Sequence, residues 1–161
     1  MLPLDDNRWE CLTTFFGEPE EVPQLLQGWL SSIGTDQEDT IYRRDLSDVF
    51  LHQATITNVA FAVVPWLVAV CKERETLYRV EYLTDIALVE ANRLKYGVHG
   101  NREGTDAYPD WLMADYHRAL VEARHFVDDV IDAELDAERK RGLVAMKPAL
   151  YGNVDLAWSQ W

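Results

Sequence analysis

The sequence has few cysteines and few basic residues. It contains two cysteines in 161 residues, and a single pair cannot define a disulfide framework, so we expect buried free thiols in a reducing cytoplasm. Lysine and arginine number 15 against 28 aspartates and glutamates, which gives a net charge of −13 at pH 7. Because phosphate contacts need basic side chains, this balance disfavours direct binding of nucleic acid or of an anionic membrane.

Signals for export and for common catalytic chemistry are also missing from the sequence. Residues 1–6 have no basic segment before an apolar one, so we expect a cytoplasmic protein without a secretory signal. The chain has no Gly-x-Ser-x-Gly, no glycine-rich phosphate loop and no paired-cysteine metal spacing. A dyad of Cys71 and His52 is conceivable, but burial of Cys71 in an apolar run would raise its pKa and leave it inert. We therefore expect no catalytic residue, cofactor or metal ion.

The longest apolar run, residues 59–71, is too short to cross a bilayer. A transmembrane helix takes about 20 apolar residues, so this run is expected to form a core helix that neighbours cover on every side. Pro65 lies within the run and predicts a kink or a break near Val64. A central strand is the competing interpretation, but the length, the alanines and the proline count against it.

Apolar residues recur at helical spacing in most of the remaining chain. The spacing predicts further helices near 6–16, 18–32, 37–52, 76–95 and 109–142, an irregular loop near 97–108, and a tail at 143–161 that ends in a short docking helix. Leu77 and Leu135 belong to the apolar stripes of two of these helices, so we expect them to face the core. No pair of strands is predicted. The expected fold is all-α, with residues 1–161 forming a single α-helical repeat domain.

A five-residue string recurs along the chain at a nearly constant spacing. VPQLL at residues 22–26 returns 42 residues later as VPWLV at 64–68, and a weaker copy, YPDWL, follows 44 residues after that at 108–112. Repeats of about 40–47 residues with two helices each are typical of HEAT and armadillo proteins. Each helical hairpin buries its apolar face against the next one, so the pattern favours a stack with one continuous core.

The order of these motifs resembles that of short bacterial HEAT-like proteins. In those proteins a His-Gln pair precedes an apolar helix that holds a Val-Pro-x-Leu element, as His52-Gln53 precedes the string at 64–68 here. The resemblance covers residues 9–95. It implies a HEAT-like α-α superhelix of about three helical hairpins, and it supplies no catalytic residue.

His52 and Gln53 lie where the third predicted helix joins the central apolar one. In one interpretation they are polar contacts in a binding groove. In the other they form a hydrogen-bonded junction that fixes the ends of the two helices. We prefer the junction, because helix termini leave backbone groups that need such partners.

Glu122 and His125 have the Glu-x-x-His spacing of helical di-iron sites. Those sites need two such motifs and a glutamate from each of two further helices, whereas this chain has one motif. A solvated or half-buried histidine is therefore the preferred interpretation. A helical metal-dependent enzyme that uses Glu122, His125 and nearby carboxylates is kept as the alternative function.

A run of acidic residues without any base occupies the second half of the last predicted helix. Its members are Asp128, Asp129, Asp132, Glu134, Asp136 and Glu138. Like charges one turn apart repel, which a protein tolerates for solubility or for contact with a basic partner. Four of these acids and one tryptophan are the predicted partner-binding residues: Asp128, Asp129, Asp132, Asp136 and Trp111.

The predicted function is that of a non-enzymatic protein-binding module with an acidic surface. A concrete form is an immunity protein that neutralises a nuclease-type bacterial toxin. Such toxins are often basic because their substrates are polyanions, and an acidic inhibitor would be steered to them quickly. Direct nucleic-acid binding ranks last, because the bases at 43–44 and 139–141 form two separate small groups.

Overall fold

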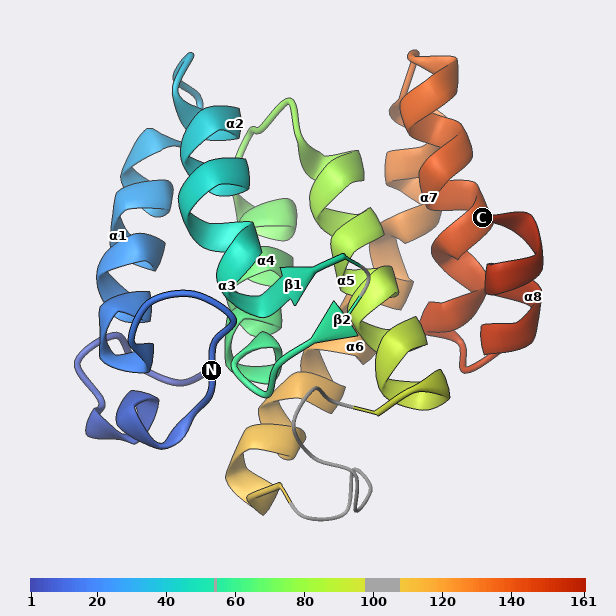
Figure 1. Cartoon of the computed structure of the whole chain (residues 1–161). Coiled ribbons are helices and arrows are strands. Elements are labelled where there is room, and N and C mark those ends of the chain that lie inside the picture. The colour runs from blue at the N-terminus through green and yellow to red at the C-terminus, as the bar shows by residue number, and fades with distance from the viewer. Residues whose placement is uncertain (54, 98–107) are drawn as a thin grey trace.

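The computed structural model of the chain describes residues 1–53, 55–97 and 108–161, which are mainly helical (Figure 1). The elements in chain order are the short 3-10 helices η1 (Asn7–Cys11) and η2 (Pro19–Glu21), α1 (Val22–Ser32), α2 (Glu38–Ile41), the π-helix η3 (Tyr42–Leu46), α3 (Ser47–Phe50), β1 (Leu51–His52), β2 (Thr55–Ile56), α4 (Ala60–Glu73), α5 (Arg79–Lys95), α6 (Asp110–Ala133), α7 (Ala137–Leu150) and α8 (Val154–Gln160). The predicted all-α class is confirmed as a mainly helical fold. The predicted loop near 97–108 lies almost wholly outside the described residues.

The main helices follow one another as antiparallel neighbours. The connections α1–α2, α4–α5 and α6–α7, which are residues 33–37, 74–78 and 134–136, all lie at one end of the molecule, at the top of Figure 1. We call this the loop end. Helix α4 packs against α5 and α6, α5 also packs against α7, and α8 covers α7 and α5.

Helix α4 forms the centre of the core, as its composition predicts. Every side chain from Ala60 to Val64 is buried, and so are Pro65, Leu67 and Val68. The helix is continuous through Pro65, so the predicted break does not occur. No helix in the described parts of the chain has both the length and the apolar character needed to cross a membrane.

The first predicted helix is wrong, because residues near 6–16 form only the single turn of η1. Asp6 caps this turn by accepting a hydrogen bond from the backbone N–H of Arg8 at 2.9 Å. Beyond it, the backbone N–H and the hydroxyl of Thr13 both donate to Asn58 Oδ1, at 2.6 and 2.9 Å. The contact with Asn58 takes the donor that would have continued the helix.

A small hairpin follows the third predicted helix, although no strands were expected. Strands β1 and β2 are antiparallel and pair Leu51 with Ile56 and His52 with Thr55. Thr57 explains why α3 stops at Phe50: its N–H donates to Phe50 O at 3.2 Å and its hydroxyl to Val49 O at 3.1 Å. The last helical carbonyls are thereby satisfied by the next segment of the chain.

The predicted long helix near 109–142 is two helices in the structure. Helix α6 ends at Ala133, and Asp136 caps α7 by accepting from the backbone N–H groups of Glu138 and Arg139, both at 2.9 Å. Aspartate favours such caps because its short carboxylate reaches the unpaired N–H groups of a first turn. Helix α7 then continues through Gly142 to Leu150, so residues 143–150 belong to a core helix rather than to a tail. The docking helix expected at the end of the chain is α8.

Candidate functional site

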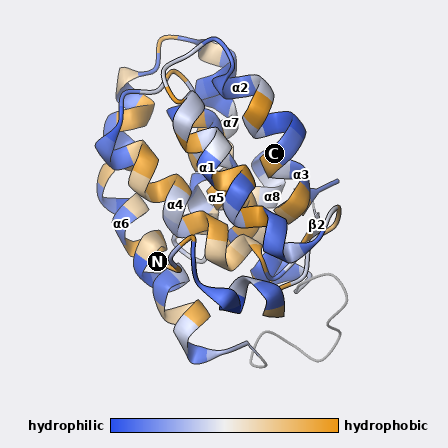
Figure 2. Ribbon diagram, turned by 90° about the vertical axis from the view of Figure 1, so that its left-hand side faces the viewer, coloured by the Kyte–Doolittle hydropathy of each residue, from blue (hydrophilic) through white to orange (hydrophobic). Residues whose placement is uncertain are grey.

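The predicted acidic surface lies on the second half of α6. Asp128, Asp129 and Asp132 are exposed there, and the Asp128 carboxylate forms an ion pair with Lys147 of α7. Asp136 is held as the N-cap of α7, where hydrogen bonds from the backbone N–H groups of Arg139 and Glu138 lower its pKa. Figure 2 shows hydrophobic and hydrophilic positions alternating along α6, as expected for a helix with one buried and one solvated face.

Trp111 does not join this acidic surface. It lies in the first turn of α6, and the 17 residues to Asp128 correspond to about 26 Å of helix. The Arg8 guanidinium lies over its ring, 4.5 Å from the centroid, and the rest of the indole packs against the core. Trp111 and the acids of α6 therefore form two separate features.

Glu122 and His125 do not assemble a metal site with other described residues. The Glu122 carboxylate forms an ion pair with Lys72 of α4, while His125 is exposed. Among the residues that the structure describes, no group of three or more His, Cys, Asp or Glu side chains could hold a metal ion.

The two cysteines have different surroundings. Cys71 is buried as expected, and burial raises its thiol pKa to about 12. Cys11 is exposed, which makes the prediction of burial wrong for this residue, because the helix that would have buried it does not form. His52 does not reach Cys71: its ring packs against those of Phe15 and Phe16, and its Nδ1 lies 3.5 Å from Asp48 Oδ1.

His52 and Gln53 form the turn side of the β1–β2 hairpin, between α3 and α4, where the sequence placed a junction. Gln53 has a φ of 49°, in the left-handed region that side chains seldom adopt. The His52 carbonyl accepts a hydrogen bond from the Thr55 hydroxyl at 2.6 Å, which closes the turn.

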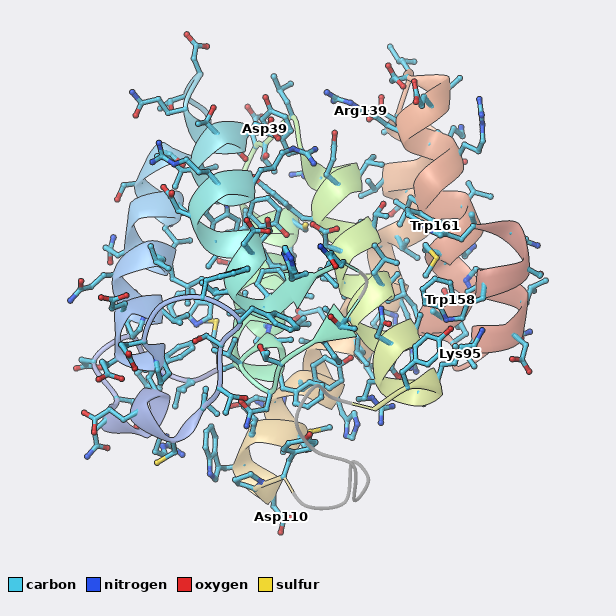
Figure 3. The ribbon with its side chains drawn as sticks, viewed as in Figure 1. Asp39, Lys95, Asp110, Arg139, Trp158 and Trp161 are labelled. Carbon is cyan, nitrogen blue, oxygen red and sulfur yellow. The ribbon has the colours of Figure 1, made fainter. Side chains whose placement is uncertain are left out.

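A groove that the sequence analysis missed runs between α5 and α7. Its volume is about 390 Å³, and its lining residues are Arg43, Val80, Glu81, Thr84, Asp85, Leu88, Glu138, Arg139, Gly142 and Trp161. In Figure 3, Arg139 marks the part of the groove nearest the loop end and Trp161 lies further down. Three separate parts of the helical stack, η3, α5 and α7, contribute to this groove together with Trp161.

Glu81 and Asp85 are the two carboxylates on the α5 wall of the groove, one helical turn apart. Glu81 Oε1 lies 3.0 Å from Arg139 Nε, and the Glu81 side chain is 17% exposed. Glu81 Oε2 is buried and has no hydrogen-bond partner among the described residues. We call this atom the unpaired oxygen of Glu81. Burial raises the pKa of Glu81.

Asp85 is held by a tyrosine from the neighbouring π-helix. The Tyr42 hydroxyl donates to Asp85 Oδ2 at 2.9 Å. Burial raises the pKa of Asp85 to about 6, although the hydrogen bond from Tyr42 and the charge of Arg43 each lower it. Arg43 itself is engaged elsewhere, because its Nε donates to Asp39 Oδ1 at 2.7 Å. The groove thus keeps partly solvated acceptors while its arginines already have partners.

Two exposed leucines lie on the connections that precede α5 and α7, outside the lining of the groove. Leu77 is 80% exposed and Leu135 is 96% exposed, so the expectation that they face the core is wrong. Both precede the first turn of a helix, where a side chain on the extended stripe no longer lies over the core. Arg139 joins the two connections, since its Nη1 donates to Leu77 O at 3.2 Å and it lies one helical turn after Leu135.

A buried carboxylate holds the loop end in place beside the groove. Glu38 is 1% exposed and accepts hydrogen bonds from Gly34 N at 2.7 Å, from the Tyr82 hydroxyl at 2.8 Å and from the Thr76 hydroxyl. Trp29 Nε1 donates in turn to the Tyr82 hydroxyl at 3.1 Å. Glu38 therefore ties the α1–α2 connection to the α4–α5 connection.

The comparisons with known proteins add no assignment. A scan against protein-family models found no matching family, and searches of curated proteins and of solved structures found no match. What the site can do is therefore inferred from its chemistry. The carboxylates of the α5–α7 groove and the exposed leucines on the nearby connections are suited to binding a cationic and partly apolar surface.

Proposed function

We propose that this protein is a non-enzymatic binding module that uses an acidic surface to bind a basic protein. The observation that carries the proposal is the net charge of −13 together with the exposed acids on α6. Asp128 forms an ion pair with Lys147, and Asp129 and Asp132 are exposed and do not take part in that pair. Acidic surfaces accelerate encounter with basic partners and repel acidic ones. A cytoplasmic immunity protein against a basic, nuclease-type toxin fits these properties.

The proposed architecture is a HEAT-like stack of helical hairpins. The packing of α4 on α6 and of α5 on α7 supports it, because successive hairpins contact through equivalent helices in such stacks. The three connections at the loop end also support it (Figure 1). Stacked hairpins present a continuous surface to a partner, which suits a binding module.

A pull-down over a salt series tests the proposed function. The protein is immobilised and exposed to a lysate of its source organism at about 50 to 500 mM NaCl, which shortens the Debye length from about 14 to 4 Å. We expect captured proteins with basic isoelectric points, whose recovery falls as salt rises. Captured proteins that are not basic, or recovery that is indifferent to salt, would contradict the proposal.

A charge-neutralised variant and a matched control sharpen this test. The triple variant Asp128→Asn, Asp129→Asn, Asp132→Asn removes the three acids in the second half of α6, and Glu18→Gln, Glu20→Gln, Glu21→Gln removes the same charge near η2. We expect the first variant to lower the association rate about tenfold at low salt and the second to lower it far less. For a captured protein that arrests growth, co-expression should restore growth with the wild type and less well with the α6 variant.

A further inference from the structure

We propose that the α5–α7 groove is the anchoring point of this interface and binds an arginine side chain of the basic partner. A neighbouring apolar side chain of the partner would pack on Leu77 and Leu135, the exposed leucines on the connections next to Arg139. The inference rests on the proposed function and adds to it a place and a recognised chemistry. Five observations carry it.

The first observation is the unpaired oxygen of Glu81. Buried polar atoms in folded proteins nearly always have a partner, and a carboxylate oxygen removed from water without a donor is costly. The described residues offer this oxygen no donor, although its twin oxygen is held 3.0 Å from Arg139 Nε. Because this oxygen is buried, a donor from a partner reaches it only when the Glu81 carboxylate turns toward the groove that it lines, and the fold offers it no competing donor among the described residues.

The second observation is the position of Asp85 one turn further along α5. A carboxylate offers about four acceptor positions, and the Tyr42 hydroxyl uses one of them. Side chains four residues apart on a helix lie about 5–6 Å apart at Cβ. A guanidinium carries donors along two edges and can reach both Glu81 and Asp85, whereas an ammonium is a compact point charge.

The third observation is the charge balance of the lining. Three acids, Glu81, Asp85 and Glu138, face two arginines. Arg43 is paired with Asp39, and Arg139 is paired with Glu81 and bonded to Leu77 O. The lining therefore has surplus acceptors and negative charge, so the group it attracts is a cation.

The fourth and fifth observations concern exposed apolar side chains, namely the two leucines beside the groove and Trp161 within its lining. Leu77 and Leu135 do not line the groove but are largely exposed on the two connections next to Arg139, which Glu38 and the Asp136 cap hold in place. Exposed apolar groups on a rigid, charged surface are typical of interface anchors. Trp161 is also exposed and lines the groove, and indole rings are favourable partners for a guanidinium.

The chemistry of the lining favours a protein partner over other occupants. A phosphate group would meet three carboxylates, and a divalent cation would need a convergent set of acids that the described residues do not provide. A partner segment with an arginine beside a large apolar residue satisfies the acids, the indole and the leucines together.

Selection from a random-peptide display library tests the inference with the full chain. The library is panned on immobilised wild-type protein, and binding of the selected peptides is then measured by calorimetry. We expect selected sequences to carry an arginine next to a large apolar residue. Replacing that arginine with lysine should weaken binding several-fold, and replacing it with uncharged citrulline should weaken it by more than about tenfold. Selected peptides without basic residues, or failure to select any peptide, would overturn the inference.

Variants of the protein locate the binding site of those peptides. Glu81→Gln removes the carboxylate charge at nearly constant side-chain shape. The double variant Leu77→Ser, Leu135→Ser removes the two exposed leucine side chains. Each should weaken binding about tenfold, while Glu20→Gln, an exposed acid far from the groove, should change it less than twofold. Circular dichroism on each variant establishes that it is folded, and a folded Glu81→Gln that binds as tightly as wild type would overturn the inference.

The outcomes separate this inference from the proposed function. If Glu81→Gln and the leucine variant capture basic proteins as well as the wild type does, with the same salt dependence, the groove is not the anchor while the acidic binding module stands. If the wild type captures no basic protein in a salt-dependent manner, the proposed function fails and the inference fails with it.

Discussion

Two glutamates near the loop end, Glu38 and Glu81, differ in how their carboxylates are satisfied. Glu38 is enclosed and accepts hydrogen bonds from a backbone N–H and two hydroxyl groups on three parts of the chain. Glu81 has one oxygen paired with Arg139 and one buried oxygen that no described residue contacts by a hydrogen bond. The two glutamates are therefore told apart by the number of donors that the fold supplies, three for Glu38 and one for Glu81 among the described residues, which suits a structural role for the first and the proposed binding role for the second.

A third carboxylate belongs with Glu38. Glu90 on α5 is buried and accepts from Arg93 Nε at 2.6 Å, Arg93 Nη2 at 2.9 Å and the Tyr116 hydroxyl at 2.8 Å. It joins α5 to α6 inside the core as Glu38 joins two connections at the loop end. Both satisfied acids hold elements together, so the comparison predicts that their loss costs stability while loss of Glu81 costs binding.

The largest effect is expected from Glu38→Ala. The change leaves the hydroxyls of Tyr82 and Thr76 and the N–H of Gly34 without their acceptor in a buried place, so it should lower the free energy of unfolding by about 3 kcal/mol. Glu81→Ala serves as its counterpart and should lower it by less than about 1 kcal/mol, because it removes one partly exposed ion pair. Urea unfolding followed by circular dichroism measures both. Equal losses for the two variants would break the comparison.

A pH-dependent effect is expected from Asp85, the second acid of the groove. Its pKa is about 6 in the folded protein and near 3.8 in the unfolded chain, so the folded state binds the proton more tightly. The contribution of Asp85 to stability is therefore fully present below pH 3.8 and is lost as the pH rises through 6. Tyr42, Arg43 and Glu81 are the charged or titratable groups that act on it.

Asp85→Asn isolates this contribution, because asparagine keeps an acceptor for Tyr42 and does not titrate. Relative to wild type, the variant should be about equally stable near pH 4 and more stable by about 2 kcal/mol at pH 7. This is less than the full difference between the two pKa values, because Asp85 is partly solvated. Urea unfolding of both proteins at a series of pH values gives the difference profile. A difference that does not change with pH would show that Asp85 ionises as freely in the folded protein as in the unfolded chain.

The smallest effect is expected from Tyr116→Phe in the Glu90 cluster. Glu90 keeps its two hydrogen bonds from Arg93, so the loss of the hydroxyl should lower the free energy of unfolding by about 1 kcal/mol. Tyr151→Phe is the matched control, because the Tyr151 hydroxyl is exposed and bonds weakly to Arg124 O at 3.3 Å. Thermal unfolding of both variants measures the effect. A Tyr116→Phe variant as stable as its control would remove Glu90 from the structural acids.

The sequence predicted the helices whose apolar pattern is strong and uninterrupted. The run at 59–71 became the buried α4, and the helices predicted at 18–32 and 76–95 became α1 and α5, each beginning a few residues later than predicted. The boundary between α6 and α7 was missed because the apolar stripe continues across it, and the cap at Asp136 looks like any other acid in a charged run. Thr13 was predicted to lie in a helix but does not, because its backbone N–H and its hydroxyl donate to Asn58. Asn58 is 45 residues away in the sequence, so no local pattern encodes this contact.

The groove could not be predicted because it depends on tertiary packing. Leu77, Glu81 and Asp85 follow one another at four-residue spacing, a signal that the sequence did contain, but Leu77 was assigned to the core stripe. Which neighbours stand opposite that row depends on how α7 and η3 pack against α5. The predicted acids of α6 were correctly identified as exposed, whereas Trp111 lies too far from them to share one contact.

The grouping of three connections at the loop end has an evolutionary consequence. Residues 33–37, 74–78 and 134–136 carry few of the side chains that fill the interior, so substitutions there leave the helices intact except at the positions that hold the frame, which are Gly34, Thr76, Tyr78 and Asp136. Under the proposed binding function, a lineage that faces a changing partner can therefore adjust its specificity at these short turns while the helices are retained. Diversification should be fastest there and slowest in α4.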